Sequence, residues 1–129
     1  MLAAGSVSDL RQRLGRIGED LACCELERRG YAILARRYRR RAGELDIVAR
    51  DGPTLVFVEV KTREGLEFGA GAEAVTFVKR RRMRLVAQDF VVRHHLTDCP
   101  CRFDVVAIDL GAGSREPAIQ VFQNAFINE

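Results

Sequence analysis

The run Leu55-Val56-Phe57-Val58 constrains the fold more than any other segment, because it is apolar at four consecutive positions. Successive side chains of a strand point to opposite faces, so such a strand needs a covering layer on both sides of its sheet. Turn residues 51–54, Asp-Gly-Pro-Thr, precede it, and residues 44–49 have the composition of a strand. We therefore predict a β-hairpin of residues 44–49 and 55–61 whose second strand lies in the middle of the sheet.

Helical spacing of apolar residues predicts a first helix that begins at the N-cap Ser8 and ends at Gly30. Its expected inward stripe consists of Leu10, Leu14, Ile17, Leu21 and Cys24. Gly15, Gly18 and Ala22 lie off that stripe. Glycine inside a helix costs about 1 kcal/mol relative to alanine, so we expect another segment to pack closely against these small residues.

The remaining pattern predicts a short strand at residues 31–35, a second helix capped by Thr76, and strands at residues 103–110 and 118–122. The second helix should turn Val78, Leu85, Val86 and Phe90 inward. Loops are expected at residues 64–72 and 111–114. The element order is αβββαββ, which predicts one α/β domain over residues 1–129, with a central mixed sheet flanked by helices and a flexible N-terminus at residues 1–7.

Composition narrows the class of protein further. The chain has 129 residues, of which 47% are hydrophobic and 30% charged, as in a globular domain. It contains no apolar run near the roughly 20 residues that span a bilayer and no signal-peptide core at its start, so we expect a cytoplasmic protein without a membrane partner. The four cysteines lack the spacing of a zinc site and are expected to be reduced thiols, with Cys24 facing the core.

The charged ends of the hairpin carry the candidate chemistry. Glu44 and Asp46 share one strand face, as do Glu59 and Lys61. If the turn is centred on Gly52-Pro53, Asp46 lies opposite Glu59 and Glu44 lies opposite Lys61. A turn centred one residue earlier, or a bulge, would change these pairs. An in-register hairpin is therefore a hypothesis on which the site depends.

Two carboxylates on directly opposite positions have Cβ atoms about 5 Å apart and repel each other unless a cation compensates. Mg²⁺, for which Mn²⁺ can substitute, suits Asp46 and Glu59, and Lys61 would orient the attacking water during in-line hydrolysis of a phosphodiester. The alternative is a set of exposed hairpin charges in which Glu44 and Lys61 form an ordinary ion pair. Glu59 and Lys61 close a buried strand, where unpaired charges are costly, and this favours the metal site.

Four segments of the chain share the pattern of a known family. They are Gly18-Glu19-Asp20-Leu21-Ala22, Gly43-Glu44-Leu45-Asp46, Phe57-Val58-Glu59-Val60-Lys61-Thr62-Arg63 and Arg102-Phe103-Asp104-Val105-Val106. With them the chain resembles, over nearly its whole length, the YraN-like family of small bacterial proteins. That family is similar to the PD-(D/E)XK nucleases of restriction-endonuclease-like fold, and most closely to archaeal Holliday-junction resolvases.

The resemblance implies roles for individual residues. Asp46 matches the isolated acid of the nuclease signature, and Glu59 and Lys61 match its Glu-X-Lys pair. Glu19 matches the glutamate of the first helix that completes the resolvase site, which makes it a third expected metal ligand. Helical periodicity alone would leave Glu19 in solvent, so its assignment rests on the resemblance. Glu44 is expected to orient or neutralise Lys61.

Arginines cluster at residues 36–41, between the first two predicted strands, and basic residues continue along 79–84 at the start of the second helix. Expected contacts to nucleic-acid phosphates are Arg39, Arg40, Arg41, Arg63, Lys79 and Arg82. The alternative is that these charges only solvate the surface. His94 and His95 close the second helix, where the helix dipole commonly favours a positive side chain. Arg102 and Asp104 are expected to form a structural pair.

Together these features favour a Mg²⁺-dependent endonuclease acting on DNA, with branched or otherwise structured DNA as the expected substrate. One alternative is a non-catalytic nucleic-acid-binding adaptor that keeps the nuclease fold. A protein-interaction module that touches no nucleic acid is a further alternative. Resolvases of the resembled fold act as dimers, which implies a homodimer here, but no face in the sequence identifies a dimer contact.

Overall fold

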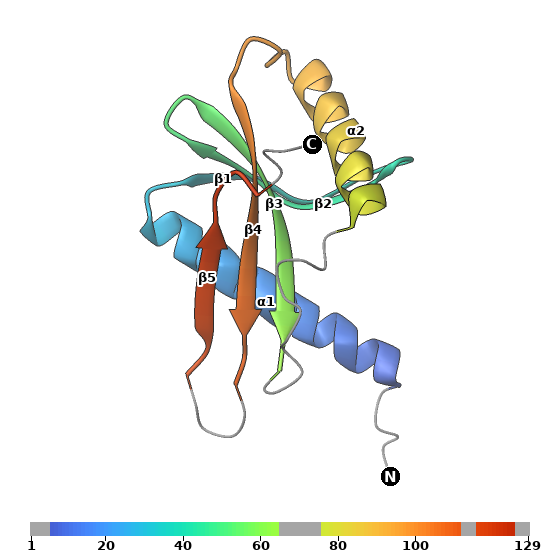
Figure 1. The fold of residues 1–129 in the computed structure, drawn as a ribbon, viewed down its shortest axis with the longest axis vertical. Coiled ribbons are helices and arrows are strands. Elements are labelled where there is room, and N and C mark those ends of the chain that lie inside the picture. Colours follow the sequence, from blue (N-terminus) through green and yellow to red (C-terminus); the bar gives the residue numbers. More distant parts are fainter. Residues whose placement is uncertain (1–5, 65–75, 112–115, 126–129) are drawn as a thin grey trace.

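The computed structural model describes residues 6–64, 76–111 and 116–125 (Figure 1). Its elements follow the predicted order: α1 Val7–Arg28, β1 Ala32–Arg40, β2 Gly43–Asp51, β3 Thr54–Arg63, α2 Phe77–Arg93, β4 Cys101–Asp109 and β5 Ala118–Phe122. Most of the two predicted loops, at 65–72 and 112–114, lies outside the described residues, as do residues 1–5 of the expected flexible N-terminus.

The five strands form one mixed sheet in the order β1-β2-β3-β4-β5. β3 pairs with β4 in parallel, and the other three pairs are antiparallel. The apolar run therefore occupies the middle of the sheet, as predicted. The α/β architecture is consistent with the restriction-endonuclease-like fold expected from the resemblance.

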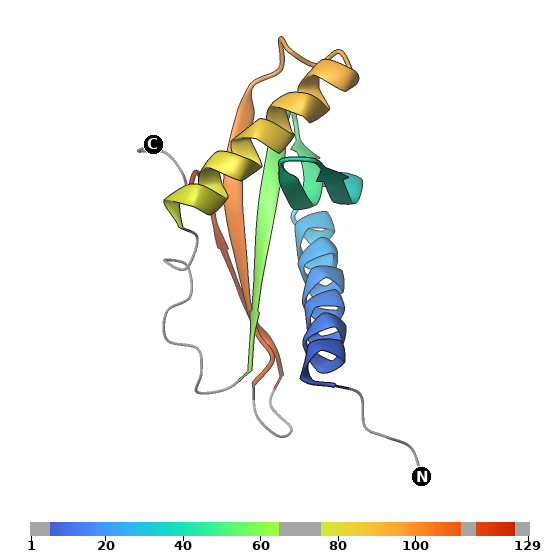
Figure 2. The ribbon, with the colours of Figure 1, turned by 90° about the vertical axis from the view of Figure 1, so that its right-hand side faces the viewer.

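The two helices cover opposite faces of this sheet, which Figure 2 shows edge-on as three layers. The side chains of β3 alternate between them: Phe57 packs in the cluster beneath α2 with Phe90, and Val58 packs in the cluster beneath α1 with Leu26. Burial of both clusters removes apolar surface from water on each side of the same strand. This explains why residues 55–58 are apolar without alternation.

The hairpin register confirms the prediction. Asp51 pairs with Thr54, and the ladder continues in step to Ile47 and Val58. The backbone pairing of β2 with β3 stops there. The next residue of β2 is Asp46, whose carboxylate accepts a hydrogen bond from the backbone N–H of Val60 at 2.8 Å. A side chain thus replaces the backbone as the partner of β3 where the two strands part.

The start of α1 differs from the expectation. Ser6, and not Ser8, is the N-cap: its hydroxyl accepts from the N–H of Asp9, and the Asp9 carboxylate accepts from the N–H of Ser6. This capping box satisfies two of the helix's free donors. The helix therefore begins two residues earlier than predicted, at Val7. At the other end Gly30 has φ 96° and ends the helix as predicted.

The predicted inward stripe of α1 is wrong at three of its five positions: Leu10 is 50% exposed, Ile17 is 47% exposed and Cys24 is exposed. Leu14 is half-buried, and Leu21 packs against the core cluster beneath the helix. The face that packs on the sheet consists of Gly18, Glu19, Ala22, Cys23 and Leu26. Small residues let the helix axis approach β3, and the expectation of close packing is confirmed at Gly18 and Ala22. At Gly15 it is wrong, because no atom lies within 4 Å of a Cβ placed there. The four cysteines are free thiols, with Cys23 instead of Cys24 facing inward.

The first strand is longer than predicted. β1 continues to Arg40, so most of the arginine cluster lies in a strand and not in a loop; a register shift after Ile33 and a positive φ at Arg37 accommodate it. Thr76 caps α2 as predicted.

On α2, Val86 and Phe90 are buried as expected, but Val78 and Leu85 are about half exposed. Met83 and Ala87 take the two inward places, because the helix presents the 83, 86, 87 and 90 positions to the sheet. Among the described residues no helix is long and apolar enough to cross a membrane.

The close approach of α1 to β3 yields a first prediction. A Cβ at Gly18 would lie 1.9 Å from the Thr62 Oγ1 atom, so Gly18→Ala should lower the free energy of unfolding by about 1–3 kcal/mol despite alanine's higher helix propensity. Gly15 has no atom within 4 Å of such a Cβ, and Gly15→Ala is the matched control, expected to stabilise by up to about 1 kcal/mol. Urea denaturation measures both; equal effects at the two glycines would contradict this packing.

Candidate active site

The site lies where β2 and β3 part. Asp46, at this point of β2, comes close to Glu59 of β3, which is only 3% exposed. Burial, and then the negative charge of Glu59, raise the pKa of Asp46 to about 8; the Val60 N–H opposes the rise and Glu19 adds to it. The sequence prediction that Asp46 and Glu59 meet at the end of the hairpin therefore agrees with their proximity in the structure.

Glu59 also contacts the only two lysines of the chain, which otherwise uses 19 arginines as its basic residues. Lys79, in the first turn of α2, forms a salt bridge with the Glu59 carboxylate. The Lys61 Nζ atom lies 3.7 Å from Glu59 Oε2. An ammonium group is a compact point charge, whereas guanidinium is a broad planar fork, so both lysines fit beside one carboxylate in a confined space.

The two lysines are electrostatically distinct. Burial, and then the neighbouring Lys79 charge, lower the pKa of Lys61. Burial also acts to lower the pKa of Lys79, but its hydrogen bond and charge interaction with Glu59 outweigh that effect and raise it. Lys79 was expected to contact substrate phosphates. Its position inside the acidic cluster is a feature that the basic run of the sequence did not indicate.

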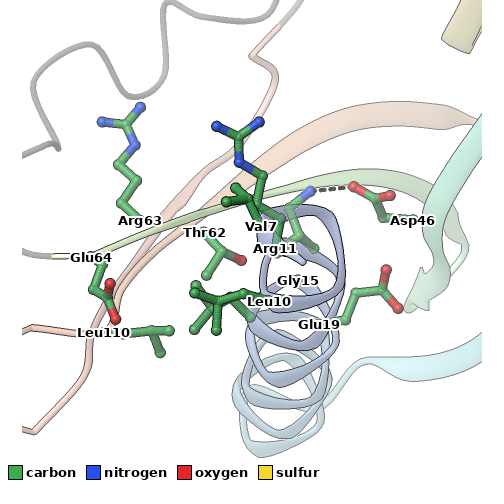
Figure 3. Close-up of a pocket in the computed structure, with 12 residues that line it drawn as sticks. Val7, Leu10, Arg11, Gly15, Glu19, Asp46, Thr62, Arg63, Glu64 and Leu110 are labelled. Carbon is green, nitrogen blue, oxygen red and sulfur yellow. Dashed lines mark hydrogen bonds between the residues drawn. The ribbon is translucent and has the colours of Figure 1, made fainter. Parts of the chain in front are cut away.

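Glu19 reaches the same region from α1 and is only 8% exposed. Its carboxylate accepts from Arg37 Nε at 3.0 Å and from Arg36 Nη2 at 3.4 Å, and it lines one cavity together with Asp46 (Figure 3). Periodicity placed Glu19 in solvent, which is wrong. The signal that could have found it is Gly18 and Ala22, since a helix face of small residues is one that approaches a neighbour.

Glu44 does not have the predicted partner. It forms a salt bridge with Arg39 across the β1–β2 pair, and the β2–β3 ladder ends before reaching it. The physical reason is that β2 follows β1, not β3, at this end of the hairpin. Glu44 nevertheless lines a second cavity, of about 450 Å³, together with Asp46, Glu59, Lys79 and Arg82.

The other basic candidates are dispersed. Arg40 bonds to Asp89 at 2.8 Å, Arg41 is exposed, and Arg63 lines the cavity that contains Glu19. At the far end of α2 the ring of His94 stacks on Phe90, with centroids 4.1 Å apart, as a helix-closing residue.

The predicted Arg102–Asp104 pair is confirmed. The Arg102 Nε atom donates to Asp104 Oδ1 at 3.0 Å, and the fully buried Asp104 also accepts from the N–H of Asn124. This pair ties β4 to the chain after β5. Its role is therefore structural.

Comparison with known proteins identifies the family of the chain. The model of the uncharacterised protein family UPF0102 matches residues 18–108, which include all four expected catalytic positions. The chain belongs to the UPF0102 family. The YraN-like resemblance is thereby confirmed.

Two UPF0102 proteins illustrate the extent of this similarity. The chain is 43% identical over 116 residues to one from Caldicellulosiruptor saccharolyticus, covering 90% of this chain and 98% of that protein. It is 49% identical over 111 residues to one from Roseiflexus castenholzii, covering 85% and 90%. The relatives thus span nearly the same domain.

The donor set fits a magnesium ion better than a metal held by protein alone. Within the part of the chain that the structure describes, no three carboxylate, histidine or cysteine side chains converge on one point as a preformed metal site. Mg²⁺ needs only one or two carboxylates and completes its shell with water and substrate oxygens. The adjacent Asp46 and Glu59 meet that requirement, and the ammonium group bound to Glu59 shows that the position favours a cation.

The raised pKa of Asp46 yields a prediction for the metal-free protein. The folded state retains a proton that the unfolded chain releases above about pH 4, so stability should fall as pH rises from there to about 8 and then level off. Asp46→Asn keeps an oxygen for the Val60 N–H but cannot ionise. Its stability, measured by denaturation in EDTA, should lack this decline.

Asp20→Asn is the control, because Asp20 is an exposed acid on α1 paired with Arg36. It should retain the wild-type decline between pH 4 and pH 8. A decline of the same size in the Asp46 variant would contradict the assignment.

Proposed function

We propose that this UPF0102 protein is a Mg²⁺-dependent endonuclease that hydrolyses phosphodiester bonds of DNA in the cytoplasm. The observation that carries the proposal is the meeting of Asp46 and Glu59 beside Lys61 at the point where a central hairpin opens. An acid on one strand and Glu-X-Lys on the next is also the pattern expected from the nuclease resemblance. Solvated surface charges would not need to be buried together.

Asp46 and Glu59 would hold the cation, with Glu19 as a third, more remote carboxylate. When bound, the cation supplies Lewis-acid polarisation of a phosphate oxygen and lowers the pKa of a coordinated water. Arg36 and Arg37 restrain Glu19 from outside the site. The Val60 N–H fixes one oxygen of Asp46.

Lys61 has the role of orienting the attacking water and offsetting the charge that develops on the phosphate. Partial burial and the neighbouring Lys79 lower its pKa, which makes its proton easier to give up than that of an exposed lysine. Lys79 balances Glu59 before a cation binds. Release of that contact would leave a second ammonium group beside the phosphate.

DNA would be bound through its phosphates by Arg39, Arg40, Arg41, Arg63 and Arg82, of which Arg63 and Arg82 line the two cavities that contain Asp46. Such contacts read backbone and shape instead of base sequence, which suits branched or structured DNA. The number of phosphate contacts should determine how steeply the DNA affinity falls with salt: the slope of log affinity against log salt concentration is about one per phosphate neutralised. Symmetric cutting of two strands would require a homodimer.

A non-catalytic DNA-binding adaptor is the second candidate. The observation that favours it is that the acids already have cationic partners within the chain: Glu59 has Lys79 and Lys61, and Glu19 has Arg36 and Arg37. In an adaptor these pairs would be permanent. In a nuclease the pair of Glu59 with Lys79 must yield to a divalent cation.

A DNA-cleavage assay distinguishes the nuclease from the adaptor. Wild-type protein with Mg²⁺ or Mn²⁺ should cut branched or flapped DNA, and Asp46→Ala or Lys61→Ala should lower the single-turnover rate by at least about a hundredfold. The reason is loss of a cation ligand in the first variant and of the charge beside the water in the second. Gel analysis of labelled strands measures the rate.

Matched controls are Asp20→Ala, an exposed acid next to Glu19 in sequence, and Arg93→Ala, an exposed base at the end of α2. Both should cut at close to the wild-type rate. Binding of every DNA with no cutting of any, in both metals, would favour the adaptor and overturn the nuclease.

The Lys79–Glu59 salt bridge generates a separate prediction. Because Lys79 occupies the carboxylate that a cation needs, Lys79→Met should raise the affinity for Mn²⁺ by about tenfold, the equivalent of removing a competing contact of about 1.4 kcal/mol. Electron paramagnetic resonance of free Mn²⁺ measures this without DNA. Arg82→Met, which changes the same cavity wall, should leave the affinity unchanged; an unchanged or weaker affinity in Lys79→Met would contradict the competition.

A further inference from the structure

A cavity of about 640 Å³ lies between the first half of α1 and the second half of β3, a volume typical of small-molecule sites. Glu19 and Asp46 close one end of it, as Figure 3 shows. Away from that end the wall combines aliphatic side chains, among them Leu10, Leu14 and Leu110, with polar and charged ones. The cavity therefore joins aliphatic side chains directly to the acids of the proposed cleavage site.

Gly15 has no structural reason to be glycine. It sits in the interior of α1, where glycine costs about 1 kcal/mol relative to alanine. At Gly18 that cost is explained, because Thr62 occupies the space of a Cβ; at Gly15 nothing lies within 4 Å of one. The open space belongs to the cavity wall. Glycine at such a place lets a molecule from outside the chain approach the backbone.

The charges around the cavity are unequal. Glu19 and Asp46 make one end acidic, whereas Arg11 and Arg63 both line the cavity and extend their guanidinium groups to the same side of it in Figure 3. Glu64 lines the cavity near Arg63, so one acid faces two bases in that part of the wall. Leu10, on the α1 wall, is half exposed although it is a large apolar residue. A ligand that complements this surface has a flat part that packs on the aliphatic side chains and an anionic part for the arginines. A nucleotide has both.

We propose that this cavity receives one unpaired nucleotide of the DNA strand next to the bond that is cut, with its base on the aliphatic wall and its flanking phosphate at Arg11 and Arg63. The proposal rests on the proposed endonuclease function and adds the substrate feature that the site selects. A base inside the cavity cannot be paired with a complementary strand. Packing of the base on aliphatic side chains does not distinguish one base from another, so all four bases should be accepted.

The test is direct binding of a short oligonucleotide, without metal and without cleavage. Single-stranded tetradeoxyadenylate is titrated into ¹⁵N- and methyl-labelled protein, and the shifts of Leu10, Leu14 and Leu110 are followed by NMR. Gly15→Leu, which fills the cavity from a position free of packing contacts, should weaken binding by about tenfold or more. Gln12→Leu adds the same side chain to an exposed position of the same helix and should bind like wild type.

Each outcome bears on the proposal. Shifts at the three leucines that disappear in Gly15→Leu and persist in Gln12→Leu support it. Wild-type protein without these shifts overturns it, and so does equal binding by the two leucine variants. Thermal unfolding of Gly15→Leu verifies that the variant is folded. Oligonucleotide binding without DNA cutting would refute the endonuclease alone, whereas cutting that is unaffected in Gly15→Leu on substrates with unpaired nucleotides would refute the cavity assignment alone.

Discussion

The hydrogen bond from the Val60 N–H to the Asp46 carboxylate is the interaction on which the rest of the site depends. Up to Ile47 and Val58 the hairpin is held by its backbone ladder; beyond them the strands part, and β3 would lose a partner for its next N–H groups. A buried N–H without a partner is costly, and the carboxylate removes that cost. In return the backbone holds Asp46 in a largely buried position beside Glu59, where burial and the Glu59 charge disfavour ionisation of Asp46.

The electrostatics of the site depend on which cationic side chains balance its carboxylates. Glu59 is almost completely buried and is balanced by Lys61 and Lys79, the only lysines of the chain. Glu19, on the other helix, is balanced by arginines. Under the proposed function, the contact that a divalent cation would replace is that of Lys79 with Glu59, whereas Glu19 would keep its arginines.

The sequence predicted those parts of the structure that are determined locally. The two-residue turn at Gly52-Pro53 fixed the hairpin register, and the uninterrupted apolar run fixed β3 as the central strand. These inferences succeeded because turn geometry and the period of a strand act over a few residues.

The packing face of α1 could not be found in the same way. Hydrophobic periodicity selected Leu10 and Ile17, whereas the helix packs through Gly18 and Ala22, which matter because their small size allows close approach. Close approach to Thr62 is a tertiary property that leaves no hydrophobic signal; the small residues Gly18 and Ala22 indicated it instead. The burial of Glu19 and the position of Lys79 result from the placement of a helix against the sheet, and hydrophobic periodicity does not reveal them.

The sheet itself divides the site. Glu19 lines only the cavity on the α1 side, and Glu59 lines only the cavity on the α2 side; among the residues that line the two, Asp46 alone is shared. It can be shared because the parting of β2 and β3 leaves its side chain at the edge between the layers. A ligand that used groups from both helices would have to pass this edge. Asp46 would then lie at the crossing point between the two halves of the site.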